Sequence, residues 1–162
     1  MDKIENEIIV FTDGSYSKNG KSSRAGYGIY FINGELNNVS RPFIKKPITS
    51  QRAELYAIYK SLNMIMTCLK DTKKIIIYSD SEYSIKSMTI WIKKWENNLW
   101  KTSSGEKVKN LDIIQGIDKL MKKFDGIIIF NHIKAHTLKQ DIISKSNEVA
   151  DKLAKAGSKI NV

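Results

Sequence analysis

The chain contains a single cysteine, few arginines and no long apolar run. Because Cys68 is alone among 162 residues, no intramolecular disulfide can form and a multi-cysteine zinc site is excluded. We expect Cys68 to be a small buried residue on a helix. No window approaches about 18 consecutive apolar residues, the minimum for a membrane span. The charged start MDKIENEIIVF does not suit a signal peptide. We therefore expect an intracellular protein of the cytoplasm or nucleus that is not secreted and has no membrane partner.

Basic residues strongly outnumber acidic ones. The chain has 27 lysines and arginines against 17 aspartates and glutamates, which gives a formal net charge of +10. Such an excess attracts polyanions, although a lysine-rich surface that serves solubility also explains it. Only three of these residues are arginines, the side chains that read base edges with two parallel hydrogen bonds. Contact with nucleic-acid phosphates is the use that this composition favours.

Short apolar strands alternate with amphipathic segments along the chain, without a repeat or a long linker. The first part predicts three antiparallel strands, and Asn33 and Gly34 join the last two. Residues 49–69 predict a helix with Thr49 or Ser50 as its N-cap. Further strands are expected over 73–80 and 127–133, and further helices over 81–95, 109–124 and 144–157, the last of them stopped by Gly157. This order predicts one α/β domain over residues 1–162, with a central mixed sheet covered by helices.

Four acidic residues occupy places from which they can meet. Asp13 in TDGS ends the first predicted strand, where Gly14 permits a tight turn, and Asp80 in YSDSEY ends the strand over 73–80. Side chains at the ends of neighbouring strands meet at the carboxyl edge of an open α/β sheet. Glu54 lies about one turn into the helix over 49–69, and Asp151 lies in the last predicted helix. The four carboxylates converge if both helices turn these faces toward that edge.

A cluster of four carboxylates implies bound cations, because like charges repel unless they are neutralised. Oxygen ligands without thiolates suit Mg²⁺ or Mn²⁺. Two such ions about 4 Å apart can activate water and stabilise the leaving oxygen of a phosphodiester. Each acid taken alone also fits a local role, such as a turn aspartate or a glutamate in the first turn of a helix. Their joint placement favours a metal site.

Five motifs, in order and across nearly the whole chain, resemble the type 1 ribonuclease H family. They are TDGS, TSQRAELYA, YSDSEYSI, the pair WIKKW and LWKTSSG, and KAHT followed by NEVADKLA. The resemblance implies a ribonuclease H-like fold, with a five-stranded mixed sheet and helices on both faces. It implies an endonuclease with two Mg²⁺ ions, Mn²⁺ being possible, that hydrolyses the RNA strand of RNA–DNA hybrids and leaves 5′-phosphate and 3′-hydroxyl ends. It also implies that Asp13, Glu54, Asp80 and Asp151 are the metal ligands.

The chain has two histidines, His132 and His136. The resemblance selects His136, which follows the last predicted strand in KAHTLKQD, where an imidazole can move protons or help products leave. His136 and Asp151 lie 15 positions apart, which leaves room for a longer loop than in the shorter-looped members of the family. We expect His132, at the end of the strand, to be a structural residue that is either packed or satisfied by hydrogen bonds.

The resemblance also assigns contacts with the two strands of a hybrid. Asn19 and Gln51 match positions that contact the RNA strand, and Ser50 stands where family members often carry asparagine. For the DNA strand, the resemblance implies an aromatic channel beside a basic protrusion, made of Tyr83, Trp91 and Trp95 with Lys93, Lys94 and Lys101. The spacing of WIKKW alone also fits an amphipathic packing face.

A pocket for a DNA phosphate is the last expected feature. Thr49 and Asn110 match two of its members, but Pro47 replaces the expected arginine, with Lys45 and Lys46 nearby. A lysine supplies charge without the guanidinium fork, so we expect the grip on the DNA strand to differ.

Two other functions stay open at the level of the sequence. A hybrid-binding module without catalysis would keep the basic face but would have lost an acid, and none is missing. An integrase- or resolvase-like nuclease would share the fold and the metals, yet it would lack the tryptophan–lysine segment and would cut DNA. Because Asp13 comes early in the chain, we expect no separate N-terminal hybrid-binding domain, and we expect a monomer.

Overall fold

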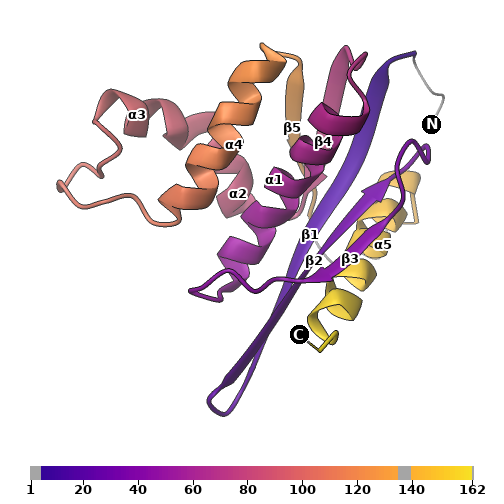
Figure 1. The fold of residues 1–162 in the computed structure, drawn as a ribbon, viewed down its shortest axis with the longest axis horizontal. Coiled ribbons are helices and arrows are strands. Elements are labelled where there is room, and N and C mark those ends of the chain that lie inside the picture. The colour runs from indigo at the N-terminus through magenta and orange to yellow at the C-terminus, as the bar shows by residue number, and fades with distance from the viewer. Residues whose placement is uncertain (1–4, 135–139, 162) are drawn as a thin grey trace.

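A five-stranded mixed sheet in the order β3-β2-β1-β4-β5 forms the centre of the protein (Figure 1). The computed structural model describes residues 5–134 and 140–161. The strands are β1 (Glu7–Asn19), β2 (Ser22–Phe31), β3 (Val39–Pro42), β4 (Lys74–Ser79) and β5 (Ile128–His132). The first three pair in antiparallel fashion, whereas β4 pairs in parallel with both β1 and β5. The predicted mixed sheet, opened by three antiparallel strands, is confirmed.

Helices cover both faces of the sheet. Helix α1 (Ser50–Cys68) lies on one face with α4 (Leu111–Phe124) packed against it, and α5 (Ile142–Ser158) covers the other face (Figure 1). Three shorter helical pieces follow one another without a break, namely α2 (Glu82–Lys86), the π-helical turn η1 (Ser87–Trp91) and α3 (Ile92–Asn97). No described helix is both long and apolar enough to cross a membrane.

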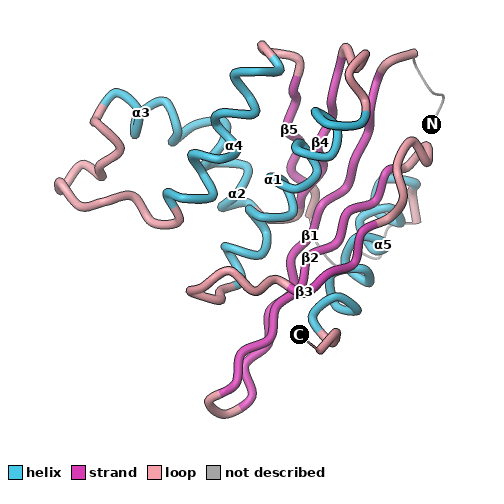
Figure 2. Tube along the Cα trace, in the orientation of Figure 1, coloured by secondary structure: helices cyan, strands magenta, loops and turns pink. Residues whose placement is uncertain are grey.

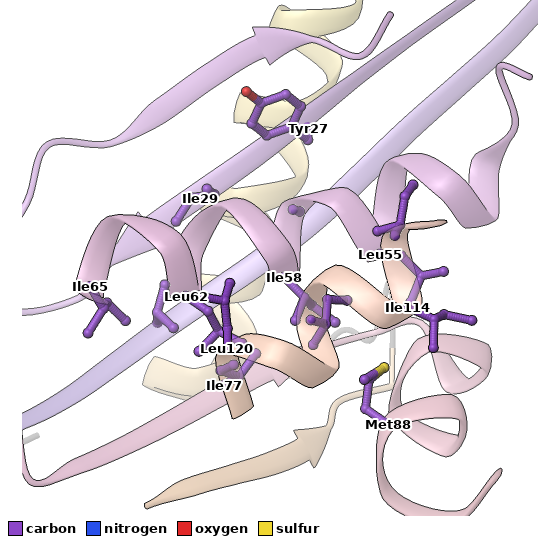
Figure 3. Packing of buried hydrophobic residues seen from close by; sticks show 14 of the residues in the cluster. Tyr27, Ile29, Leu55, Ile58, Leu62, Ile65, Ile77, Met88, Ile114 and Leu120 are labelled. Atoms are coloured by element: carbon purple, nitrogen blue, oxygen red, sulfur yellow. The ribbon is translucent and has the colours of Figure 1, made fainter. Parts of the chain in front are cut away.

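The alternation of side chains along β1 builds a core on each side of the sheet. Ile8 and Val10 face the α1 side, whereas Ile9 and Phe11 face the α5 side, because successive strand residues point to opposite faces. The larger core lies between the sheet, α1 and α4, where buried aliphatic side chains of the helices meet those of the strands (Figure 3). Because β1 is buried on both faces, helices pack against it from both sides of the sheet.

Three expectations about local structure are wrong. The first strand does not end in a turn at Asp13 but continues to Asn19, because it pairs with β2 in a hairpin that projects beyond the rest of the sheet (Figure 2). Gly157 lies inside α5, which ends one residue later. A Cβ there would come within 2.5 Å of the Arg41 carbonyl oxygen, so the glycine lets α5 approach β3. Cys68 is exposed at the end of α1.

Candidate active site

Asp13 lies where β1 changes partners. The parallel pairing with β4 ends at Thr12 and Ser79, and beyond that point β1 pairs only with β2. Asp80 follows the last residue of β4 directly, just before Ser81, the N-cap of α2. The two aspartates therefore lie next to each other at the carboxyl edge of β4, as predicted, although Asp13 lies within its strand and not at the end.

Glu54 reaches the same edge from the first turns of α1. Thr49 is the N-cap of this helix, and its hydroxyl accepts a hydrogen bond from the backbone N–H of Arg52 at 3.2 Å. The N–H of Gly14 donates to Glu54 Oε1. A Cβ at Gly14 would lie 2.5 Å from the backbone nitrogen of Glu54, closer than any side chain permits. The glycine therefore serves the close contact between β1 and α1 that brings Glu54 beside Asp13.

The three carboxylates form one compact cluster. One oxygen each of Asp13, Glu54 and Asp80 lies within 4.8 Å of the others. Asp13 is 4% exposed and Glu54 is 7% exposed. Burial, the hydrogen bond with Glu54 and the neighbouring charges raise the pKa of Asp13 far above its usual range. Burial also raises the pKa of Glu54, against the lowering effect of hydrogen bonds from Asp13 and Gly14. Because all three donors are carboxylate oxygens and their charges oppose one another, the cluster suits a hard divalent cation.

Asp151 lies at the margin of this cluster and not within it. It is within hydrogen-bond reach of Asp13, but it does not belong to the compact set found among the described residues. Its Oδ2 lies 3.0 Å from the Nζ of Lys155, one helical turn further along α5. The structure thus brings together three of the four acids expected from the sequence and places the fourth beside them in an ion pair.

Two residues beside Asp80 were not among the site residues predicted from the sequence. The amide of Asn147, on α5, lies 3.3 Å from Asp80 Oδ2, and Nε2 of His132 lies 3.2 Å from the Asp80 carbonyl oxygen. His132 is exposed and therefore not packed, but its ring is engaged by this contact, as the other expected alternative requires. Asn147 precedes Asp151 by four positions, a spacing that places both on one helix face and could have identified it. His136 lies outside the described residues.

Tyr83, Trp91 and Trp95 form a continuous row of rings. The ring centroids of Tyr83 and Trp91 are 5.9 Å apart, as are those of Trp91 and Trp95. Residues eight positions apart on an α-helix differ by about 80° in direction, whereas those seven apart differ by only about 20°. The π-helical turn between Tyr83 and Trp91 takes up one additional residue, so the two rings share a face in spite of their spacing.

Exposed lysines lie on the same helix as this aromatic row and on the loop after it, and an amide contacts Tyr83. Lys93 and Lys94 are exposed on α3, and Lys101 is exposed at an isolated antiparallel bridge with Lys107. Figure 2 shows α3 and the following loop standing away from the sheet, as a basic protrusion would. The side-chain amide of Asn110 donates to the Tyr83 hydroxyl at 3.0 Å, which connects the row to the start of α4.

The remaining residues expected to bind the substrate lie on two sides of the carboxylates. Ser50 and Gln51 are exposed in the first turn of α1, beside Thr49. Asn19 is exposed at the far end of β1, roughly 20 Å from Asp13 at about 3.3 Å per residue of strand. The structure therefore brings Thr49, Ser50 and Gln51 near Glu54 and leaves Asn19 at the tip of the hairpin.

The loop that carries Pro47 is tied to α4 through a buried arginine. Arg52 is 3% exposed, and its guanidinium donates to both carboxylate oxygens of Asp112 at 2.8 Å. Lys45 lies 3.6 Å from the same carboxylate. Arg52 lies three residues after Thr49, and Asp112 lies two residues after Asn110. The Arg52–Asp112 pair therefore holds Thr49 near Asn110. Lys45 brings a cation to this place, partly neutralised by Asp112.

Comparisons with known proteins agree with this arrangement. A family profile described as RNase H matches residues 5–159. The chain is 38% identical to "Ribonuclease H" of Schizosaccharomyces pombe over 93% of its own length and 52% of that protein. It is 33% identical to "Ribonuclease H" of Actinobacillus pleuropneumoniae, covering 93% of this chain and 90% of the bacterial one. Its fold is similar to the solution structure of the PFV RNase H domain, with a TM-score of 0.78 and 28% identity over 93% of both chains. The chain spans about half the length of the first curated relatives that it matches.

Proposed function

Because the chain belongs to the type 1 ribonuclease H family, we propose that it is an endonuclease that hydrolyses the RNA strand of RNA–DNA hybrids. The relatives are named for this activity, and the solved structures with a similar fold include a reverse transcriptase in complex with an RNA/DNA hybrid. The location inside the cell and the monomeric state, both expected from the sequence, stay predictions.

One observation carries the proposal, namely the buried cluster of Asp13, Glu54 and Asp80. A fold gains nothing from three neighbouring acids, two of them buried, unless something binds there, because burial and mutual repulsion both oppose ionisation. These residues, with Asp151 at their margin, would hold divalent ions, Mg²⁺ or Mn²⁺ by the hardness of the donors. Two such ions, when bound, supply the positive charge that activates an attacking water and stabilises the leaving oxygen of the phosphodiester.

The chain's own residues would orient the acids and the substrate. The Gly14 N–H holds Glu54, and Asn147 and His132 hold the carboxylate and the carbonyl of Asp80. Fixed carboxylates lose little freedom when they bind a cation, so the site is organised in advance. His136 would accept or deliver a proton during the reaction or assist product release, as the resemblance implies.

The row of Tyr83, Trp91 and Trp95 would contact the DNA strand. Stacked rings suit the bases and sugars of a nucleic acid without regard to sequence, and Lys93, Lys94 and Lys101 would contact its phosphates. Thr49, Asn110 and Lys45 would bind one phosphate of this strand, and the exposed Ser50, Gln51 and Asn19 would face the RNA strand. An integrase-like activity on DNA is less favoured, because this aromatic and basic row suits a hybrid.

The test is cleavage of end-labelled RNA–DNA hybrid, double-stranded RNA and double-stranded DNA, side by side with Mg²⁺. We expect cleavage of the hybrid alone, with 5′-phosphate on the downstream fragments, and none by the Asp13→Asn protein. Equal cleavage of double-stranded DNA would contradict hybrid selectivity. Binding of the hybrid without cleavage by the folded parental protein would favour the non-catalytic binding module.

A further inference from the structure

Helix α5 turns three polar side chains toward the carboxylate cluster. Asn147, Asp151 and Lys155 follow one another at intervals of four residues, which places them on one side of the helix. Asn147 contacts Asp80, Asp151 approaches Asp13, and Lys155 pairs with Asp151 at 3.0 Å. The ammonium group of Lys155 therefore lies beside Asp151, at the edge of the Asp13–Glu54–Asp80 cluster.

The ion pair explains why Asp151 stands apart from the compact set. Its Oδ2 is engaged by Lys155 at 3.0 Å. Lys155 thus supplies a single positive charge to an acidic site that has an excess of negative charge. Its side chain is 56% exposed, so it can move into solvent without leaving a cavity.

We propose that Lys155 is a positioning residue that competes with a divalent cation for Asp151 and so sets the metal concentration at which the site fills. This inference rests on the proposed metal site. If Asp151 is to join Asp13 as a ligand, its Oδ2 must leave Lys155 or share the contact, and a divalent ion next to the ammonium is repelled. The lysine occupies Asp151 when the metal is scarce and yields when it is abundant.

The size of the effect follows from the exposure of the pair. An exposed ion pair between helix residues four apart contributes about a factor of two to an equilibrium. Repulsion between the ammonium and a divalent ion adds to this, reduced by solvent because Lys155 is more than half exposed. We expect removal of the lysine charge to lower the half-saturating metal concentration about two- to fivefold.

The experiment compares Lys155→Gln with Lys152→Gln, in the protein with and without nucleic acid. Lys152 is exposed on the same helix, one residue past Asp151, so both variants lose one charge and only one loses the pair. Calorimetric titration with Mn²⁺ alone measures metal affinity, and cleavage against Mg²⁺ concentration measures the same quantity in turnover. We expect tighter Mn²⁺ binding in Lys155→Gln, parental binding in Lys152→Gln, and near-parental binding in Lys155→Arg.

Equal Mn²⁺ affinity in Lys155→Gln and Lys152→Gln would overturn the proposal, and so would weaker binding in Lys155→Gln. An unchanged metal requirement with a raised KM for the hybrid would identify Lys155 as a substrate contact, which also overturns it. If the parental protein fails to cleave the hybrid but Lys155→Gln still binds Mn²⁺ more tightly, the proposed activity fails and the competition by Lys155 stands.

Discussion

Replacement of Asp13 by asparagine should stabilise the metal-free protein while it abolishes cleavage. In the cluster, Asp13 shares a hydrogen bond with Glu54 and accepts one from the Gly14 N–H at 2.9 Å, so it acts as a protonated acid. Asparagine has nearly the same shape, and its amide can donate to Glu54 where the carboxyl proton does. The variant keeps both contacts without the need to bind a proton on folding.

The gain should depend on pH in a defined direction. The raised pKa of Asp13 means that the folded state holds its proton while the unfolded state, with a pKa of about 3.9, releases it. Stability due to this group is present below about pH 4 and is lost as the pH rises toward the folded pKa, at about 1.4 kcal/mol per pH unit. At pH 7 the cost is therefore about 4 kcal/mol at most, and at pH 5 about 1 to 2 kcal/mol. Asp13 is 4% exposed, so solvent screening reduces these figures little.

Thermal unfolding followed by circular dichroism, in EDTA at pH 5 and pH 7, measures this difference. We expect Asp13→Asn to exceed the parental protein by about 5 to 15 °C at pH 7, since 1 kcal/mol corresponds to about 2–4 °C for a domain of this size. The gap should shrink at pH 5 and also on addition of Mg²⁺, which stabilises only the parental site. Asp71→Asn, an exposed replacement with the same charge change, should have little effect. A gap that is independent of pH, or a less stable variant, would refute the reasoning.

Four further predictions concern the rest of the site. Replacement of Lys93, Lys94 and Lys101 by glutamine should flatten the slope of log affinity for the hybrid against log salt by roughly two units, measured in an Asp13→Asn background; parallel lines would exclude phosphate contact. Tyr83→Phe removes the acceptor of the Asn110 amide, so hybrid affinity in the same background should fall by about 1 kcal/mol. Unchanged affinity would show that this hydrogen bond does not contribute to hybrid binding. Asp112→Asn removes the charge that compensates the buried Arg52, so chemical denaturation should report a loss of about 2 to 3 kcal/mol; a neutral result would mean that Arg52 finds another partner. His136→Ala should slow turnover with measurable activity left, and a steady-state rate equal to the parental one would remove this histidine from the reaction.

The sequence predicts the sheet, its helices and the meeting of Asp13, Glu54 and Asp80, because period-two and helical patterns locate strand ends and helix faces. It mislocates Asp13 relative to its strand, since only the pairing partners show that β1 continues as a hairpin with β2. It also cannot show that Asp151 lies beside the cluster in a pair with Lys155, because that depends on how deeply α5 settles against the sheet. His132 illustrates the same point: its strand position is predicted correctly, but its proximity to the Asp80 carbonyl follows from the register of β5 with β4.

The π-helical turn that ends at Trp91 is a place where the helix can lose a residue and still present the aromatic row to a nucleic acid. One residue more than a regular helix needs is absorbed between Tyr83 and Trp91, while the rings on either side keep a common face. Loss of the exposed Thr89 would turn this stretch into an ordinary α-helix with a seven-residue interval, and that interval presents the same face. In an evolving lineage, a single-codon loss here is silent for the aromatic row, whereas a single-codon gain between Trp91 and Trp95 would turn the two rings to different faces.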